Sequence, residues 1–193
     1  MEYLPNEIKN NIKDHIIFKP KNKKQLQNAV DLWCEDKEKA LNKYGHISNW
    51  NTSLITDMSE LFKNKEYFNE NINNWNVSKV INMGEMFMRA KLFNKPLDLW
   101  NVLSVTNMGY IFFGAYTFNQ NINSWNVSSV THMSNMFNGA SLFNQPLNNW
   151  DVSNVKNMNF MFRSAHSFNQ PLNNWDVSNV KNNTHRMFTG AQS

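Results

Sequence analysis

Tryptophan recurs with a constant spacing of 25 residues through most of the chain. It stands at six positions without slippage: Trp50, Trp75, Trp100, Trp125, Trp150 and Trp175. The surrounding residues recur with it, as in WNVSSVTHMSNMFNGASLFNQPLNN and WDVSNVKNMNFMFRSAHSFNQPLNN. A unit of 25 residues buries too little apolar surface to fold alone, so such units have to stack on one another. The 193 residues are therefore expected to form one elongated array.

The apolar spacing within each unit predicts two elements. Residues 147–155 follow the L-x-x-L-x-L spacing of leucine-rich repeats, in which the alternating part is a short strand. Residues 158–165 place apolar side chains at i, i+3, i+4 and i+7, as on one face of a short helix. Pro171 then prevents the helix from continuing. The sequence predicts an α/β solenoid, similar to leucine-rich repeats, with short parallel strands, short helices and six 25-residue coils.

The domain organisation follows from the repeat. Residues 1–49 form an N-terminal segment with a capping helix at about 23–44, between Asn22 as N-cap and Gly45 just past its end. Residues 50–193 form the solenoid, with repeats starting at 50, 75, 100, 125, 150 and 175. In the last repeat a one-residue insertion is expected to move Met187 and Phe188 out of the apolar register. Cys34 has no partner for a disulfide and is expected to be a small core residue.

Asparagine is abundant and recurs with the repeat. It follows a phenylalanine in five successive units, at Asn69, Asn94, Asn119, Asn144 and Asn169. Stacked side-chain amides can both donate to and accept from neighbouring turns. We expect these residues to form a structural ladder along the array, with a row of ligand-binding amides as the alternative.

The repeat consensus W-[ND]-V-S-x-V-x-N-M-x-x-M-F-x-x-A-x-x-F-N-Q-P-L covers roughly residues 50–190. It resembles the BspA-like surface-protein repeat, a family counted as a domain of unknown function in mycoplasmas, Listeria and other bacteria and also found in large DNA viruses. The preceding segment, 18–50, is similar to the N-terminal cap seen in family members from large viruses and some protists. The resemblance implies a leucine-rich-repeat-like array used for binding or adhesion, without catalytic residues.

The chemistry-bearing residues do not form an enzyme signature. Five histidines lack the spacing of a zinc site, and there is no glycine-rich phosphate loop, so neither a metal nor a cofactor is expected. Asp151 and Asp176 are expected to stack one coil apart, but the equivalent position tolerates an amide in other repeats, which argues against general acid–base catalysis. The chain is predicted not to be an enzyme.

Charge and location restrict the partners. The net charge is +4, yet no Lys, Arg, Asp or Glu occurs between Leu99 and Trp150, and the basic residues lie near the two ends. The N-terminal residues do not resemble a signal peptide and no apolar run is long enough for a membrane span, so an intracellular location is expected, in a host cell or a virion if the protein is viral. N-x-S sequons at Asn51, Asn76 and Asn126 fall on predicted strands, where glycans would crowd the next coil.

The predicted function is a repeat scaffold that binds a protein, either a host or a viral one. Two surfaces compete for this role. The helical face would carry an apolar patch of Met88, Tyr110, Phe113, Tyr116 and Phe160. The strand face would carry Asn76, Asn101, Leu103, Asn126, Asp151 and Asp176. The alternatives are binding of nucleic acid or another polyanion through the basic ends, which the uncharged middle disfavours, and self-association through the C-terminal coil.

Overall fold

The N-terminal cap is built from two helices that meet at one residue. The computed structural model describes residues 17–181 and 183–191. Helix α2 (Lys23–Glu35) begins at Asn22, whose side chain accepts a backbone N–H three residues on. Asp36 ends α2 and its carboxylate caps α3 (Lys37–Tyr44), which ends at Gly45 with a φ of 69°. The break within the span predicted as one helix therefore comes from this second N-cap.

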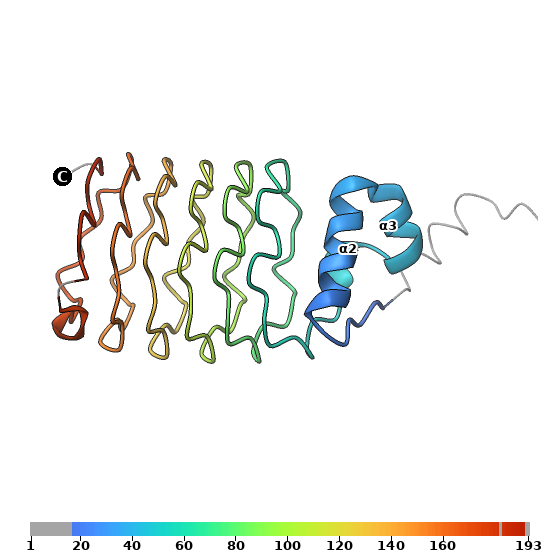
Figure 1. Ribbon diagram of the computed structural model, residues 1–193, viewed down its shortest axis with the longest axis horizontal. Coiled ribbons are helices and arrows are strands. Elements are labelled where there is room, and N and C mark those ends of the chain that lie inside the picture. The colour runs from blue at the N-terminus through green and yellow to red at the C-terminus, as the bar shows by residue number, and fades with distance from the viewer. Residues whose placement is uncertain (1–16, 182, 192–193) are drawn as a thin grey trace, which may run out of the picture.

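From Trp50 onward the chain winds into coils that stack in a row beside the cap (Figure 1). Four alternate backbone N–H groups of each coil donate to carbonyls of the next coil. For the first pair of coils these bonds are Met58 to Asn82, Glu60 to Gly84, Phe62 to Met86 and Asn64 to Met88, at 2.8–3.0 Å. The same four bonds recur at each later interface, up to the bond from Ser164 to Thr189. These four bonds all run in one direction: their N–H donors point toward the C-terminal end of the row and their carbonyl acceptors point toward the cap.

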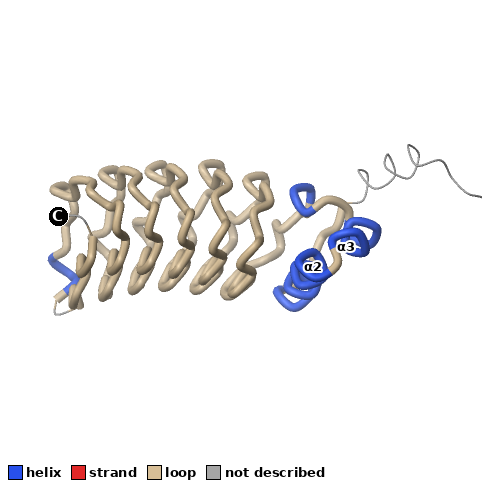
Figure 2. The backbone as a smooth tube through the Cα atoms, turned by 90° about the horizontal axis from the view of Figure 1, so that it is seen from above, coloured by secondary structure: helices blue, strands red, loops and turns tan. Residues whose placement is uncertain are grey.

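The predicted α/β solenoid is wrong, because the coils contain neither the helices nor the strands expected of them. Between Trp50 and Val177 the described residues form turns and isolated bridges (Figure 2), and the short 3₁₀ helices η1 (Ile47–Asn49) and η2 (Ser178–Val180) lie outside that range. One residue per coil forms a parallel bridge, in the series Asp57, Asn82, Asn107, His132 and Asn157. No sheet results among these residues.

Two consecutive turns replace each predicted helix. In the first coil, the N–H of Leu61 donates to the carbonyl of Met58 and the N–H of Lys65 donates to that of Phe62. The third residue of each turn, Glu60 or Asn64, has a φ near +60°, as in type II turns. A turn repeated every four residues points the same apolar positions inward as a helix does, which is why the periodicity misled the prediction.

An asparagine or aspartate side chain interrupts each predicted strand. The Oδ1 of Asn126 accepts the backbone N–H of Ser128 at 3.1 Å, and a turn from Val127 to Val130 follows directly. These N–H groups are used within the coil and are not available to a neighbouring strand. The expectation that Trp and Val point inward is nevertheless confirmed, since Trp125 and Val127 are both 1% exposed.

Aromatic columns fill the centre of the array. Phe62, Phe87, Phe112, Phe137, Phe162 and Phe188 stack one coil apart, with ring centroids 5.3–5.7 Å from one another. The indole N–H of each tryptophan from Trp75 to Trp175 donates to the carbonyl of the residue 28 positions earlier, at 2.8–3.2 Å. For Trp75 this is Ile47 in η1. The last coil therefore absorbs its inserted residue, and the expectation that Phe188 leaves the register is wrong.

The predicted asparagine ladder is confirmed. The Oδ1 atoms of Asn69, Asn94, Asn119 and Asn144 each accept the backbone N–H of the asparagine one coil further on, at 2.9–3.0 Å. From Asn94 onward the same oxygen also accepts a glutamine side chain, as from Gln120 at 2.8 Å. The amides thus satisfy backbone groups at the turns, which is a structural role.

Helix α2 covers the first coil where a preceding coil would otherwise lie. The side chain of Gln27 donates to the carbonyl of Leu61 at 3.0 Å, which is one of the acceptors that the ladder leaves open at this end. Ion pairs flank this contact, between Lys23 and Asp57 at 3.2 Å and between Asp31 and Lys65 at 2.7 Å. The cap therefore replaces one of the four ladder hydrogen bonds as well as the apolar packing of a missing coil.

Candidate functional site

The surface predicted as a helical face is formed by the paired turns. We call it the turn face and define it by three positions per coil: Glu60, Lys63 and Asn64; Glu85, Met88 and Arg89; Tyr110, Phe113 and Gly114; Asn135, Asn138 and Gly139; Phe160, Arg163 and Ser164. Because equivalent positions stack along the array, this face varies in chemistry from coil to coil. It is acidic and basic near the cap and aromatic further along.

The structure brings together only part of the predicted apolar patch. Tyr110 is 37% exposed and its ring lies 5.7 Å from that of Phe113, which is half-buried. Met88 occupies the position of Phe113 one coil earlier. Phe160 lies two coils further on, behind the hydrogen-bonded pair Asn135 and Asn138. The patch is therefore divided into a Tyr110 group and a Phe160 group.

Large side chains on this face occupy a strained backbone conformation. Tyr110 has a φ of 60° and Phe160 a φ of 58°, in the left-handed region. Asparagine adopts this region readily, as at Asn135, whereas a bulky residue there costs about 1–3 kcal/mol. Tyr110 and Phe160 therefore occupy positions at which the backbone conformation favours asparagine or glycine.

A second exposed apolar row runs along the corner that follows the turns, and sequence reasoning found only one of its members. We call it the corner row; it consists of Tyr67, Leu92, Tyr116 and Leu142. Tyr67 is 84% exposed and Tyr116 is 54% exposed. The backbone N–H of Leu142 donates to the carbonyl of Tyr116, so these two residues are neighbours in adjacent coils. Tyr67, Leu92 and Leu142 each directly precede a repeated phenylalanine, and Tyr116 lies two residues before one. Apolar residues so close to a buried phenylalanine resemble core positions in the sequence.

The predicted strand face is occupied by local hydrogen bonds. At Asn76, Asn101, Asn126, Asp151 and Asp176 the side-chain oxygen accepts the backbone N–H two residues on, at 3.0–3.1 Å. All five are exposed, and we call them, together with the exposed Leu103, the Asx row.

The two aspartates of the Asx row are held in their ionised form. The side-chain and backbone hydrogen bonds from Ser153 lower the pKa of Asp151. The backbone hydrogen bond from Ser178, followed by its hydroxyl, lowers the pKa of Asp176. Carboxyl groups with lowered pKa values are poor proton donors at neutral pH, so the pair is not arranged for general acid catalysis.

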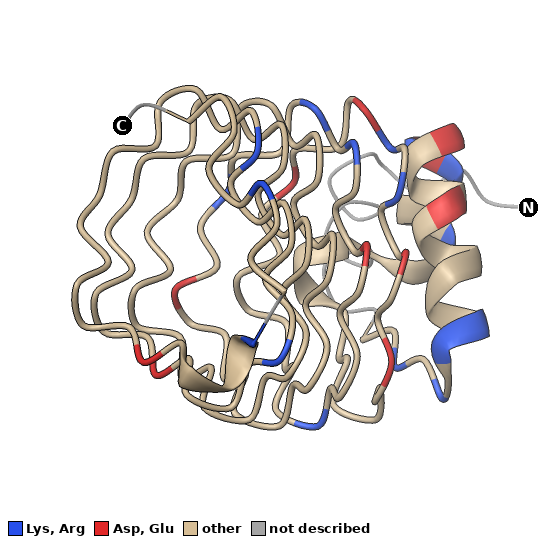
Figure 3. Ribbon diagram, turned by 60° about the vertical axis from the view of Figure 1, so that its left-hand side comes forward, with Lys and Arg blue, Asp and Glu red and all other residues tan. Residues whose placement is uncertain are grey.

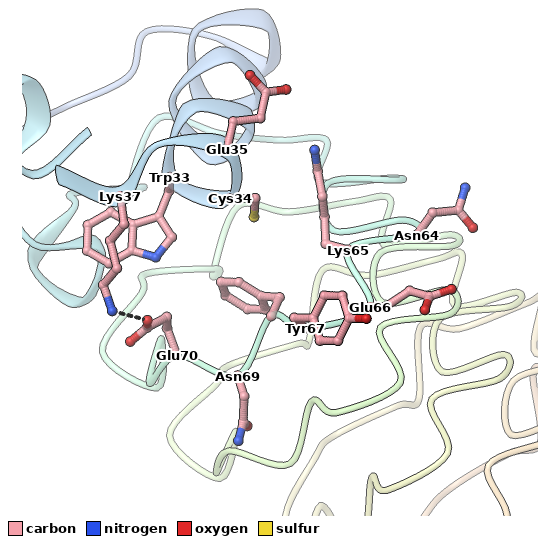
Figure 4. A pocket seen from close by; sticks show the side chains of 11 residues that line it. Trp33, Cys34, Glu35, Lys37, Asn64, Lys65, Glu66, Tyr67, Asn69 and Glu70 are labelled. Atoms are coloured by element: carbon pink, nitrogen blue, oxygen red, sulfur yellow. Dashed lines mark hydrogen bonds and ion pairs between the residues drawn. The ribbon is translucent and has the colours of Figure 1, made fainter. Parts of the chain in front are cut away.

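A hollow of about 490 Å³ lies between the end of α2 and the first coil (Figure 4). Trp33 and Phe68 line it together with Lys37, Glu70 and Cys34. Lys37 pairs with Glu70 and lies 5.2 Å from the Trp33 ring centroid, so its charge is already compensated. Cys34 is exposed here, and the expectation that it is a core residue is wrong.

Cys34 is expected to react slowly with alkylating agents. Its surface reaches solvent, but burial of the thiol raises its pKa from 9.0 to about 11. The thiolate fraction at neutral pH falls about a hundredfold, and higher thiolate nucleophilicity offsets only part of this. Iodoacetamide labelling followed by mass spectrometry should be about tenfold slower than for free cysteine and should accelerate up to about pH 11. Labelling of the folded and the denatured protein at equal rates would contradict this assignment.

The described residues hold neither a metal cluster nor a membrane helix. No three His, Cys, Asp or Glu side chains gather there in a way that would hold a metal ion. None of the helices in residues 17–181 and 183–191 has the length and apolar character needed to span a bilayer.

Comparison with known proteins identifies the repeat. A family model described as "Mycoplasma protein of unknown function, DUF285" matches residues 28–130 and again residues 97–193. No curated protein and no solved structure matches the chain significantly. The two matches cover both the cap region and the coils, and they confirm the predicted BspA-like repeat. The chain therefore belongs to the DUF285 family of Mycoplasma-type proteins of unknown function.

Proposed function

We propose that the chain is a non-enzymatic scaffold whose turn face binds a protein partner. The observation that carries this proposal is the aromatic pair Tyr110 and Phe113, placed 5.7 Å apart on the uncharged part of the array. The next coil has Asn135 and Asn138 at the same positions, so the fold does not require aromatic rings there. Exposed aromatic residues on a rigid surface are typical anchors of protein interfaces.

The double substitution Tyr110→Asn, Phe113→Asn is expected to abolish capture of the partner while the protein stays folded. It reproduces the Asn135–Asn138 pair, whose side chains hydrogen bond at 2.7 Å, and it relieves the strained φ of Tyr110. Stability measured by urea unfolding should stay within about 1 kcal/mol of the original. Capture from cells that make the protein, read out by quantitative mass spectrometry, checks the binding.

Leu103→Ser provides the matched control on the Asx row. It removes the exposed leucine of that row and installs the residue that Ser78, Ser128 and Ser153 supply in other coils. Under this proposal Leu103→Ser retains the same partner that the double variant loses. The reverse pattern would move the binding site to the Asx row.

The two alternative functions receive less support. Acidic and basic positions lie near one another around the cap (Figure 3). Lys23, Lys37 and Lys65 form ion pairs with Asp57, Glu70 and Asp31, which weakens a polyanion site there. Lys19, Lys21 and Lys24 make no ion pair with the described residues, and Lys9 and Lys13 lie outside them. Self-association through the last described coil would bring its four ladder N–H donors against the same donors of a second copy, and donors facing donors form no hydrogen bonds. Other bonds between coils run toward the cap, as from Leu142 to Tyr116 and from Asn169 to Asn144, so the donor row disfavours this contact only in part.

The proposal also covers the form of the family and the location of the protein. We infer that the chain represents the form found in large DNA viruses, because the segment before Trp50 resembles the cap of that form and folds as α2 and α3. An intracellular location fits the exposed N-x-S sequons at Asn76 and Asn126, whose side chains are engaged in Asx turns. Fluorescence microscopy of the tagged full-length protein tests the location.

A further inference from the structure

Two arginines on the turn face lie over aromatic rings. The guanidinium of Arg89 is 6.0 Å from the centre of the Phe113 ring, and that of Arg163 is 5.6 Å from the centre of the Phe160 ring. Both arginines are exposed. Within residues 17–181 and 183–191 every ion pair is made by a lysine, so neither guanidinium is neutralised by an acid of these residues.

The aromatic rings restrict the conformations of these arginine side chains. Stacking over a ring restricts the long side chain and leaves the N–H groups of the planar guanidinium available. A guanidinium in this arrangement matches the two oxygens of a carboxylate. The imidazole of His185 packs edge-on against the same Phe160 ring that Arg163 overlies, with ring centroids 5.4 Å apart.

The spacing of the two arginines defines the ligand. The guanidinium of Arg89 lies over Phe113 and that of Arg163 over Phe160, two coils further on, which is about 10 Å at about 4.8 Å per coil. Carboxylates four residues apart on an extended peptide are about 13 Å apart, and the reach of the flexible glutamate and arginine side chains covers the difference of about 3 Å. The chain carries no Lys, Arg, Asp or Glu from Leu99 to Trp150, so the coils between the two arginines offer no competing charge.

We propose that the turn face recognises an extended acidic protein segment that lies along the array, with two carboxylates four residues apart, one bound by each arginine. The segment passes over Tyr110 and then over the polar pair Asn135 and Asn138, so an apolar residue beside the first acid fits best. This inference rests on the proposed function and specifies the chemistry of its partner.

Peptide titration tests the proposal. The probe is the peptide acetyl-Thr-Glu-Leu-Thr-Val-Glu-Thr-amide, titrated into the full chain at low salt and followed by NMR shifts. The control peptide acetyl-Thr-Leu-Thr-Val-Glu-Glu-Thr-amide has the same composition with adjacent acids. We expect the first peptide to bind about tenfold more tightly, and Arg89→Gln, Arg163→Gln to remove that difference. Lys43→Gln, Lys79→Gln removes the same charge elsewhere and should leave the difference unchanged.

The outcomes separate this inference from the proposed function. Equal affinity for the two peptides would overturn the acidic-segment proposal, as would an equal loss in the lysine control variant. Tighter binding of oligothymidylate of ten nucleotides, with a steep salt dependence, would also overturn it and favour a nucleic acid. If the peptides behave alike while Tyr110→Asn, Phe113→Asn still loses its partner, the proposed function stands and only the chemistry of the partner is wrong.

Discussion

Trp125→Ala is expected to lower the free energy of unfolding by about 4–6 kcal/mol. Trp125 is 1% exposed and stacks on Trp100 with ring centroids 6.3 Å apart. Its indole N–H donates to the carbonyl of Leu97 at 2.9 Å, so truncation leaves a cavity and also an unsatisfied buried carbonyl. Urea unfolding followed by circular dichroism measures the change.

Two companion variants separate these contributions. Trp125→Phe keeps an aromatic ring in the column but removes the N–H, and should cost about 1–3 kcal/mol for the unpaired carbonyl of Leu97. Tyr116→Ala, at an exposed position of the corner row, should change stability by less than about 1 kcal/mol. A change below about 1 kcal/mol for Trp125→Ala would show that the tryptophan column does not stabilise the array.

Deletion of residues 1–45 is expected to make the protein aggregate. The cap covers the first coil, and its removal exposes the apolar side chains of Trp50, Leu61 and Phe62, all at most 2% exposed in the full chain. It also removes the Gln27 side chain from the carbonyl of Leu61. Terminal coils of repeat proteins need a polar outer surface, so the truncated array should lose solubility or its cooperative unfolding transition.

Size-exclusion chromatography and calorimetry of the truncated chain check this expectation. Lys65→Met is the control, because it breaks the ion pair with Asp31 but leaves α2 in place, and surface ion pairs contribute about 0–1 kcal/mol. The control should remain soluble and monomeric. A soluble truncated protein that melts at the original temperature would show that α2 and α3 do not stabilise the array.

The sequence predicts the register of this fold better than its local structure. The 25-residue period, the inward tryptophans and the asparagine ladder follow directly from the spacing, because stacked identical coils bring equivalent residues together. The turn conformation did not follow, since the left-handed φ of Glu60 or Tyr110 has no residue signature comparable to glycine. Likewise, Asp36 reads as one more helix residue until its carboxylate is seen to cap α3.

The candidate surface was predicted in part. Variation between equivalent positions indicates that the repeated core does not need Tyr110 and Phe113, and the structure leaves Tyr110 exposed and Phe113 half-buried. The stacking of Arg89 over Phe113 depends on a contact between adjacent coils, and spacing within one repeat does not reveal it. The Asx row was predicted as a polar strip available for binding, whereas its side-chain oxygens already accept backbone N–H groups.

The most direct test of the proposed turn-face site is site-specific photocrosslinking. Benzoylphenylalanine is incorporated at position 110 on the turn face and, in a separate protein, at position 103 on the Asx row. Both positions are exposed, so the two probes have comparable access to a partner. The proposed function predicts a discrete crosslinked protein from position 110 and none from position 103. A discrete crosslink from position 103 with none from position 110 would contradict it.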